Sequence, residues 1–229
     1  MSQQKSSLQP VDFIIIYIGG ALLAGWLQML LYQSVPTLTE STAGRLISGL
    51  WLQDGIMLLI LLLCLRVRHA NGRALGACRP QGRRPVLGAV LAGLLLYVLM
   101  AVMVQLVNAI LPNGLADQNV QSYMQPDDSL GIKLFVIFTM GVFVPIVEEL
   151  IFRGYLFHSL LGRMTPNMAM LFTAIIFGAA HLDWQRMVPL ALGGYLLNVV
   201  AVRYQSVFAS AISHGVWNIV MMILYYCAI

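Results

Sequence analysis

The chain has 229 residues, of which 59% are hydrophobic and only 10% are charged. Soluble domains contain about 25% charged residues, so this composition excludes an ordinary soluble protein and predicts an all-α, polytopic membrane protein. The formal net charge of +4 is concentrated in one short loop, which favours a signal for membrane topology over nucleic-acid binding. We therefore expect the lipid bilayer as the surroundings of the chain, and no nucleic acid as a partner.

Seven stretches are long and apolar enough to cross a bilayer, which takes about 20 residues of α-helix. In chain order they cover residues 13–32, 46–65, 86–111, 132–161, 167–182, 187–202 and 207–228. The fourth is long and contains charged residues, so it is either one tilted helix or a span followed by a second helical piece. The predicted fold is a transmembrane helical bundle with about seven to eight spanning helices.

The loops between these stretches differ in charge. Cytoplasmic loops carry an excess of Lys and Arg, so the arginine-rich loop predicts the cytoplasmic side. Alternation then places the N-terminus inside, the acidic loop outside, the next two basic loops inside again and, with seven spans, the C-terminus outside. The residues concerned are Arg66, Arg68, Arg73, Arg79, Arg83 and Arg84 in the arginine-rich loop, Asp117, Asp127 and Asp128 in the acidic loop, and Arg163 and Arg203.

Three polar patterns interrupt the apolar C-terminal half: EELIFR at 148–153, FGAAH at 177–181 and HGVWN at 214–218. A charged side chain at the centre of a bilayer costs roughly 2.5–3.5 kcal/mol on insertion scales, so such residues usually face the protein interior and serve a site. In each pattern two residues lie four positions apart, which puts them on one face of a helix. We therefore look for one site that uses all three patterns.

The loop at 162–167 provides a depth scale for two of these patterns. Glu148 lies 15 residues before Arg163, and His181 lies 15 residues after Pro166. At 1.5 Å per residue, both lie on the order of 22 Å from this loop if the chain is helical. His214 lies roughly 16 Å from the same side by the same reasoning. The polar residues are therefore expected to face one another across a cavity.

Glu148 and Glu149 are neighbours, so their side chains diverge by about 100° around a helix and cannot have the same role. The simplest division pairs Glu149 with Arg153 as a structural ion pair and leaves Glu148 facing the cavity. Glu148 and His181 could then activate a water molecule, and His214 with Asn218 could donate hydrogen bonds to an oxyanion. This set of groups suits hydrolysis of a peptide bond.

In their order and spacing, the three patterns resemble the EExxxR, FxxxH and HxxxN signature of the CPBP family, which comprises CAAX proteases and bacteriocin-processing enzymes. The resemblance covers residues 132–229 and leaves 1–131 as supporting transmembrane helices. It implies an intramembrane endopeptidase that cleaves a membrane-associated or lipidated protein or peptide. Carried over by position, the catalytic residues are Glu148, His181, His214 and Asn218, and the supporting residues are Glu149, Arg153 and Phe177.

The resemblance leaves the role of a metal open, because members of the family have been described both as metalloproteases and as metal-independent glutamate proteases. No HExxH pattern is present, so the usual zincin spacing is absent. Glu148, His181 and His214 could still bind zinc as one carboxylate and two imidazoles. We favour the metal-free reaction, with no cofactor, and keep zinc as the alternative.

Two other classes of function fit intramembrane Glu and His residues. One is a proton-coupled transporter, although the sequence has no inverted repeat of broken helices. The other is a catalytically silent membrane scaffold or immunity protein. In each case we expect a multi-pass protein of the bacterial inner membrane. The sequence also leaves Asp54 undecided between an interfacial position and the lining of the cavity.

Overall fold

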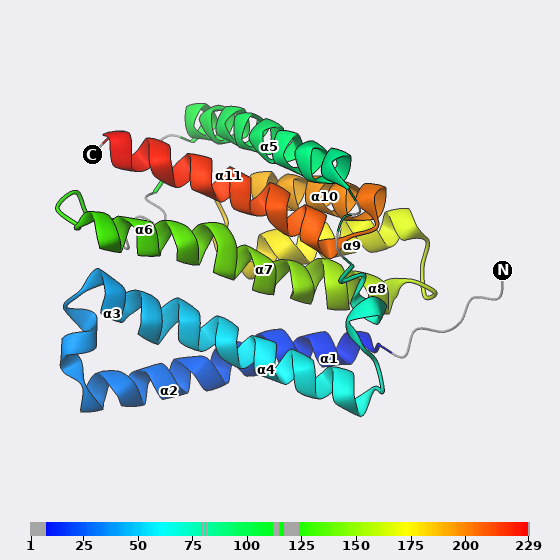
Figure 1. Cartoon of the computed structure of the whole chain (residues 1–229), viewed down its shortest axis with the longest axis horizontal. Coiled ribbons are helices and arrows are strands. Elements are labelled where there is room, and N and C mark those ends of the chain that lie inside the picture. The colour runs from blue at the N-terminus through cyan, green and yellow to red at the C-terminus, as the bar shows by residue number, and fades with distance from the viewer. Residues whose placement is uncertain (1–7, 79, 81, 112–114, 117–123, 229) are drawn as a thin grey trace.

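The computed structural model describes residues 8–78, 80, 82–111, 115–116 and 124–228 (Figure 1). Arg79 of the arginine-rich loop, Asp117 of the acidic loop and residue 229 lie outside these ranges. Most of the described residues are helical.

The segments labelled η are π-helical or 3-10 turns, and most of them continue an α-helix without a break. The N-terminal part contains α1 (Pro10–Ile14), η1 (Ile15–Gly19), α2 (Gly20–Ser34), η2 (Pro36–Thr39), α3 (Thr42–Leu46), η3 (Ile47–Trp51), α4 (Leu52–Val67), η4 (Gly72–Leu75) and α5 (Arg83–Ile110). The C-terminal part contains α6 (Leu130–Phe138), η6 (Thr139–Phe143), α7 (Val144–Glu149), η7 (Leu150–Leu156), α8 (Phe157–Leu160), α9 (Pro166–Ala180), α10 (Met187–Tyr204) and α11 (Val207–Ala228).

Six helices of the described chain are long and apolar enough to cross a membrane, so the predicted helical membrane bundle is confirmed. They are Pro10–Ser34, Thr42–Val67, Arg83–Ile110, Leu130–Leu160, Met187–Tyr204 and Val207–Ala228. The fourth is one continuous helical stretch, which is the first of the two forms predicted for it. The fifth predicted span, 167–182, forms the shorter apolar helix α9.

The shortness of α9 follows from its two ends. Thr165 accepts a hydrogen bond from the backbone N–H of Met168, and Pro166 occupies the first turn, so the helix starts there. At the other end Leu182 has a left-handed backbone with φ of 54°, which stops the helix. With 15 residues, α9 extends about 22 Å, less than the roughly 30 Å of a bilayer core.

The loops gather at two ends of the bundle, as the charge pattern predicts. At one end the backbone N–H of Val207 donates to the carbonyl of Gly76, 3.1 Å away, beside the arginine-rich loop. At the opposite end, the start of the second span lies beside the loop that precedes the fourth. The Thr42 hydroxyl donates to Asp128 there over 3.2 Å. The chain therefore alternates between a basic and an acidic end, and Figure 1 shows the C-terminus at the acidic end.

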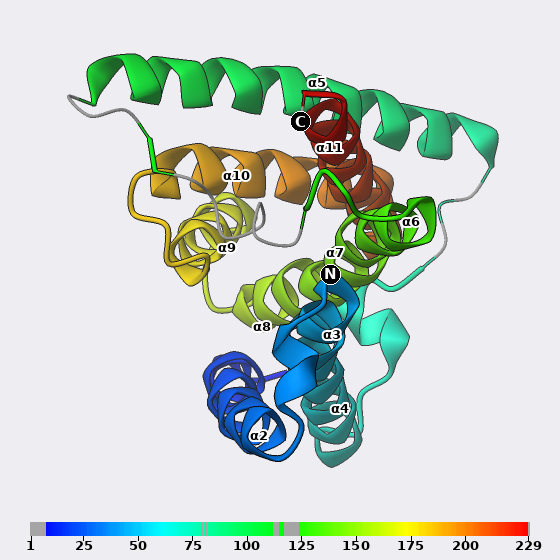
Figure 2. The same cartoon turned by 90° about the vertical axis from the view of Figure 1, so that its left-hand side faces the viewer.

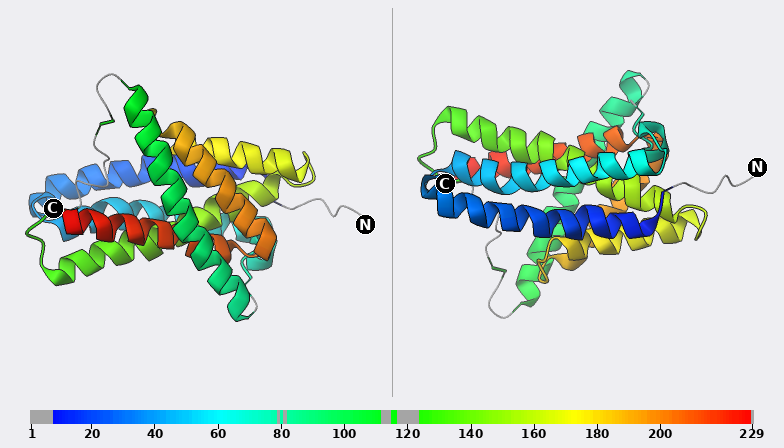
Figure 3. Two further views of the ribbon diagram at one scale, coloured as in Figure 1. Left: turned by 90° about the horizontal axis from the view of Figure 1, so that it is seen from above. Right: turned by 90° about the horizontal axis from the view of Figure 1, so that it is seen from below.

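The helices form three groups when the bundle is viewed along its length (Figure 2). The hairpin of α1–α2 and α3–α4 lies on one side, and α5 lies on the opposite side. The stretch from α6 to α8, together with α9 to α11, fills the space between them. Seen from above, α5 crosses α11 and runs roughly alongside α10 (Figure 3). The middle group, which carries the three polar patterns, therefore lies between the N-terminal hairpin and α5.

Candidate active site

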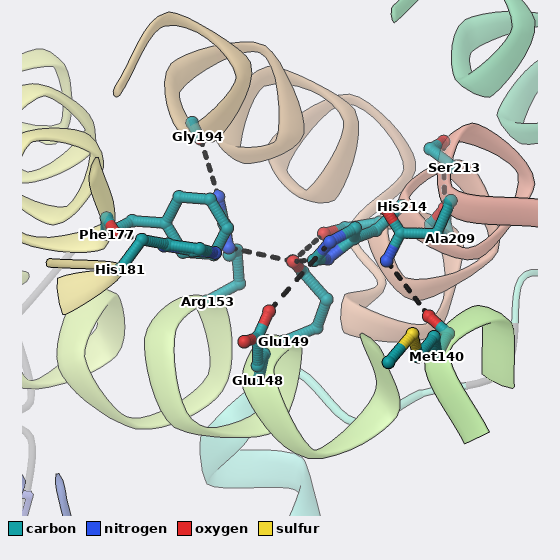
Figure 4. Close-up of polar contacts among 12 residues, drawn as sticks. Met140, Glu148, Glu149, Arg153, Phe177, His181, Gly194, Ala209, Ser213 and His214 are labelled. Carbon is teal, nitrogen blue, oxygen red and sulfur yellow. Dashed lines mark hydrogen bonds and ion pairs between the residues drawn. The ribbon is translucent and has the colours of Figure 1, made fainter. Parts of the chain in front are cut away.

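Four elements of the middle group, α7, η7, α9 and α11, bring the polar patterns together (Figure 4). The first pattern starts at the end of α7 and continues into η7, the second ends α9, and the third lies in α11. Both α7 and η7 contact α11, and η7 also contacts α9. Glu148 and Glu149 lie between two π-helical segments, η6 and η7. Such segments are frequent at functional sites.

The centre of this site is a fully buried ion pair. Glu149 and Arg153 both have side-chain exposures of 0%, and Arg153 Nη1 lies 2.8 Å from Glu149 Oε1. Arg153 Nη2 also donates to the carbonyl oxygen of Gly194 over 2.8 Å, and the guanidinium stacks 4.3 Å from the ring centre of Phe177. The predicted pairing of Glu149 with Arg153 is therefore confirmed, and it links η7 to α9 and α10.

Helix α11 adds two further partners to Glu149. The Nδ1 atom of His214 lies 3.0 Å from Glu149 Oε1, and the hydroxyl of Ser210 donates to Oε2. With Arg153, these groups engage both carboxylate oxygens of Glu149, which is consistent with a bracing role. Ser210 was not predicted as part of the site, although Ser210, His214 and Asn218 follow one another at intervals of four residues, which indicates a shared helix face.

Glu148 has a different environment from its neighbour. Its side chain is 24% exposed, and Oε2 lies 3.9 Å from Nε2 of His214. This separation is too long for a direct hydrogen bond, and the contact is an ion pair only when the His214 ring carries a positive charge. The two adjacent carboxylates thus have separate roles in the geometry, since only Glu148 remains open to a ligand or water.

His181 lies at the C-terminal end of α9 and is exposed. Its Nδ1 atom lies 2.8 Å from the carbonyl oxygen of Phe177, and the two rings are 4.7 Å apart. Because a carbonyl oxygen only accepts hydrogen bonds, Nδ1 must carry the hydrogen, so Nε2 of the neutral ring has a free lone pair. In the view of Figure 4, His181 and His214 lie on opposite sides of Glu149.

Asn218 lies one turn beyond His214 on α11. Its amide Nδ2 donates to the carbonyl oxygen of Met140, 2.9 Å away. Met140 belongs to η6, where the irregular helix allows a carbonyl to accept from another helix. Since an amide group has two N–H bonds, one remains for another acceptor.

The N-terminal helices contribute two further polar residues near this site. Asp54 of α4 is only 5% exposed, and its Oδ2 has no hydrogen-bond partner among the described residues. Tyr17 of η1 donates its hydroxyl to the carbonyl oxygen of Ala180 over 3.0 Å. Both side chains interact electrostatically with Glu148. The interfacial alternative for Asp54 is therefore wrong, and Tyr17 is a contact that no sequence pattern indicated.

The geometry does not match the zinc alternative. Within the described parts of the chain, no three His, Cys, Asp or Glu side chains converge as ligands of a metal ion would. Of the three residues named for zinc, Glu148 and His214 face each other, but His181 does not complete a cluster with them. We therefore derive no step of a reaction through a metal.

Residues 130–220 match the family described as type II CAAX prenyl endopeptidase Rce1-like. All three polar patterns fall within this stretch, so the match confirms the family resemblance inferred from their spacing. Comparisons with curated proteins and with solved structures gave no match. The family and the six membrane-spanning helices together indicate an integral membrane protein.

Proposed function

We propose that the protein is an intramembrane endopeptidase with Glu148 and His181 as the groups that activate water, and the match of residues 130–220 to the CAAX prenyl endopeptidase family supports this. The observation that carries the proposal is the contrast between the two adjacent carboxylates. Glu149 is fully buried and held by Arg153, His214 and Ser210, whereas Glu148 is 24% exposed and faces His214 Nε2.

In the proposed reaction, Glu148 accepts a proton from water while the water oxygen attacks the carbonyl carbon of the peptide bond. The free Nε2 lone pair of His181 orients the same water by accepting its other hydrogen. Glu148 then passes its proton to the leaving nitrogen, and the C–N bond breaks. The products are a carboxylic acid and an amine, so the reaction consumes one water and needs no other reactant.

The negative charge that develops on the carbonyl oxygen needs hydrogen-bond donors. We assign this role to His214 through Nε2 and to the second amide N–H of Asn218. His214 must carry a proton on both nitrogens for this, since Nδ1 already faces Glu149. Glu149, Arg153 and Phe177 support the site by fixing the orientation of His214 and the distance between α9 and η7.

We propose a membrane-associated peptide or protein as the substrate, because Glu148 lies inside a membrane-spanning helix. A prenyl group on that substrate is not required by the chemistry of the site. We further propose the bacterial inner membrane as the location of the protein.

The test is reconstitution of the purified protein in lipid vesicles with a library of membrane-associated peptides, and detection of cleavage products by mass spectrometry. Glu148→Gln and His181→Ala are expected to lower kcat by about 100-fold or more. The matched controls are Glu40→Gln and His69→Ala, which alter exposed residues of the same types. Cleavage that survives both site variants would remove the mechanism, and a wild type without products would favour the scaffold or transporter alternative.

A second arm of this experiment addresses the metal. We expect a chelator to leave cleavage unchanged, because the proposed water activation uses only Glu148 and His181. Loss of activity with the chelator and recovery with added zinc would instead show a metalloprotease.

A further inference from the structure

We propose that Tyr17, which lies outside the family-matched stretch, is a positioning residue that holds His181 in place. This inference rests on the proposed function, because His181 matters only if its imidazole orients water. It differs from that function in assigning part of the site to the N-terminal hairpin of helices.

The first observation is a hydrogen bond next to the catalytic imidazole. The Tyr17 hydroxyl donates to the carbonyl oxygen of Ala180 over 3.0 Å, and Ala180 is the last residue of α9, immediately before His181. The last carbonyls of a helix lack partners within the helix and fray unless another group binds them. Tyr17 therefore fixes the end of α9 from which the His181 side chain extends.

The second observation is a chain of aromatic contacts that reaches the same imidazole. The ring of Tyr17 packs edge-on against Phe152 at 5.4 Å, and Phe152 packs against Phe177 at 5.1 Å. Phe177 in turn lies 4.7 Å from the ring of His181. Phe152 and Phe177 are each only 1% exposed, so neither ring can move without displacing its neighbours.

These two routes distinguish Tyr17 from a residue that takes part in the chemistry. Its hydroxyl hydrogen is already used by the Ala180 carbonyl, so it is not free to donate to an oxyanion. Its effect must therefore pass through the position of His181. Loss of the hydroxyl should slow the water-activation step and leave substrate binding nearly unchanged.

The test compares Tyr17→Phe with a matched control, Tyr155→Phe. Both changes remove one tyrosine hydroxyl that bonds between helices, but the Tyr155 hydroxyl donates to Asp12 rather than to the end of α9. We expect Tyr17→Phe to lower kcat by about three- to tenfold, with KM changed by less than about twofold. Tyr155→Phe should leave both constants within about twofold of the wild type.

A second measurement does not depend on protease activity. Modification of histidines by diethyl pyrocarbonate, followed by peptide mass spectrometry, reports the reactivity of His181 with the exposed His69 as an internal reference. We expect Tyr17→Phe to raise the rate at His181 by about twofold or more and to leave His69 unchanged.

The outcomes separate this inference from the proposed function. A Tyr17→Phe variant with wild-type kcat and wild-type His181 reactivity would overturn the positioning role, as would equal losses in Tyr17→Phe and Tyr155→Phe. If the wild type cleaves no peptide but Tyr17→Phe still changes the reactivity of His181, the positioning contact stands and the proposed protease activity fails.

Discussion

Replacement of Arg153 by methionine tests the account of the buried ion pair most directly. The Arg153→Met variant keeps a long apolar side chain but removes the guanidinium from a site with 0% exposure on both partners. Glu149 would then retain only its hydrogen bonds from Ser210 and His214. Breaking a buried pair by removing one partner costs about 3–5 kcal/mol, mostly because the remaining charge is left uncompensated. We therefore expect a loss of stability in this range.

The double variant Arg153→Met with Glu149→Gln shows whether this reason is correct. It removes both charges, and the amide oxygen of the introduced glutamine can still accept from the groups on α11. Replacing both members of a buried pair by uncharged groups often changes stability little. The double variant should therefore lose less than about 2 kcal/mol of unfolding free energy. Equilibrium unfolding in mixed micelles measures both values. The reasoning would be refuted if Arg153→Met lowered the unfolding free energy by less than about 1 kcal/mol. It would also be refuted if the loss in the double variant equalled the sum of the losses in Arg153→Met alone and Glu149→Gln alone.

Two further predictions concern packing around the same network. Gly215→Ala should lower the unfolding free energy by about 1–3 kcal/mol, because the new methyl group would collide with the backbone carbonyl of Gly141. Gly55→Ala is the control, since a methyl group there meets no atom within 4 Å, and equal thermal unfolding of the two variants would contradict this packing. Ser210→Ala should lower the unfolding free energy by about 1 kcal/mol, because it removes one hydrogen-bond donor to Glu149. Unchanged stability in the same micelle assay would count against that hydrogen bond.

The local part of the site could be predicted from sequence, because helix geometry relates residues four apart. The spacing of Glu149 and Arg153 was sufficient to predict their pairing, and the neighbouring position of Glu148 was sufficient to predict a different environment. The same rule would also have found Ser210, which precedes His214 by four residues.

Contacts between helices could not be predicted in the same way. Tyr17 and Ala180 are 163 residues apart, and only the packing of the N-terminal hairpin against α9 brings them together. The burial of Asp54 likewise depends on the rotation of α4, which its apolar residues do not determine in a membrane, since most faces of that helix are apolar. The short length of α9 depends on the left-handed backbone at Leu182, which is an unusual conformation for this residue type.

The position of Glu149 and Arg153 on one helix, with His214 on another, has a consequence for the biogenesis of the protein. The carboxylate and the guanidinium lie four residues apart, so they can neutralise each other as soon as their own segment enters the bilayer. His214 and Asn218 belong to α11, which the ribosome synthesises after that segment. A nascent chain therefore carries a stable charge pair but an incomplete active site until α11 is inserted. Under the proposed function, peptide cleavage can begin only after α11 has been inserted.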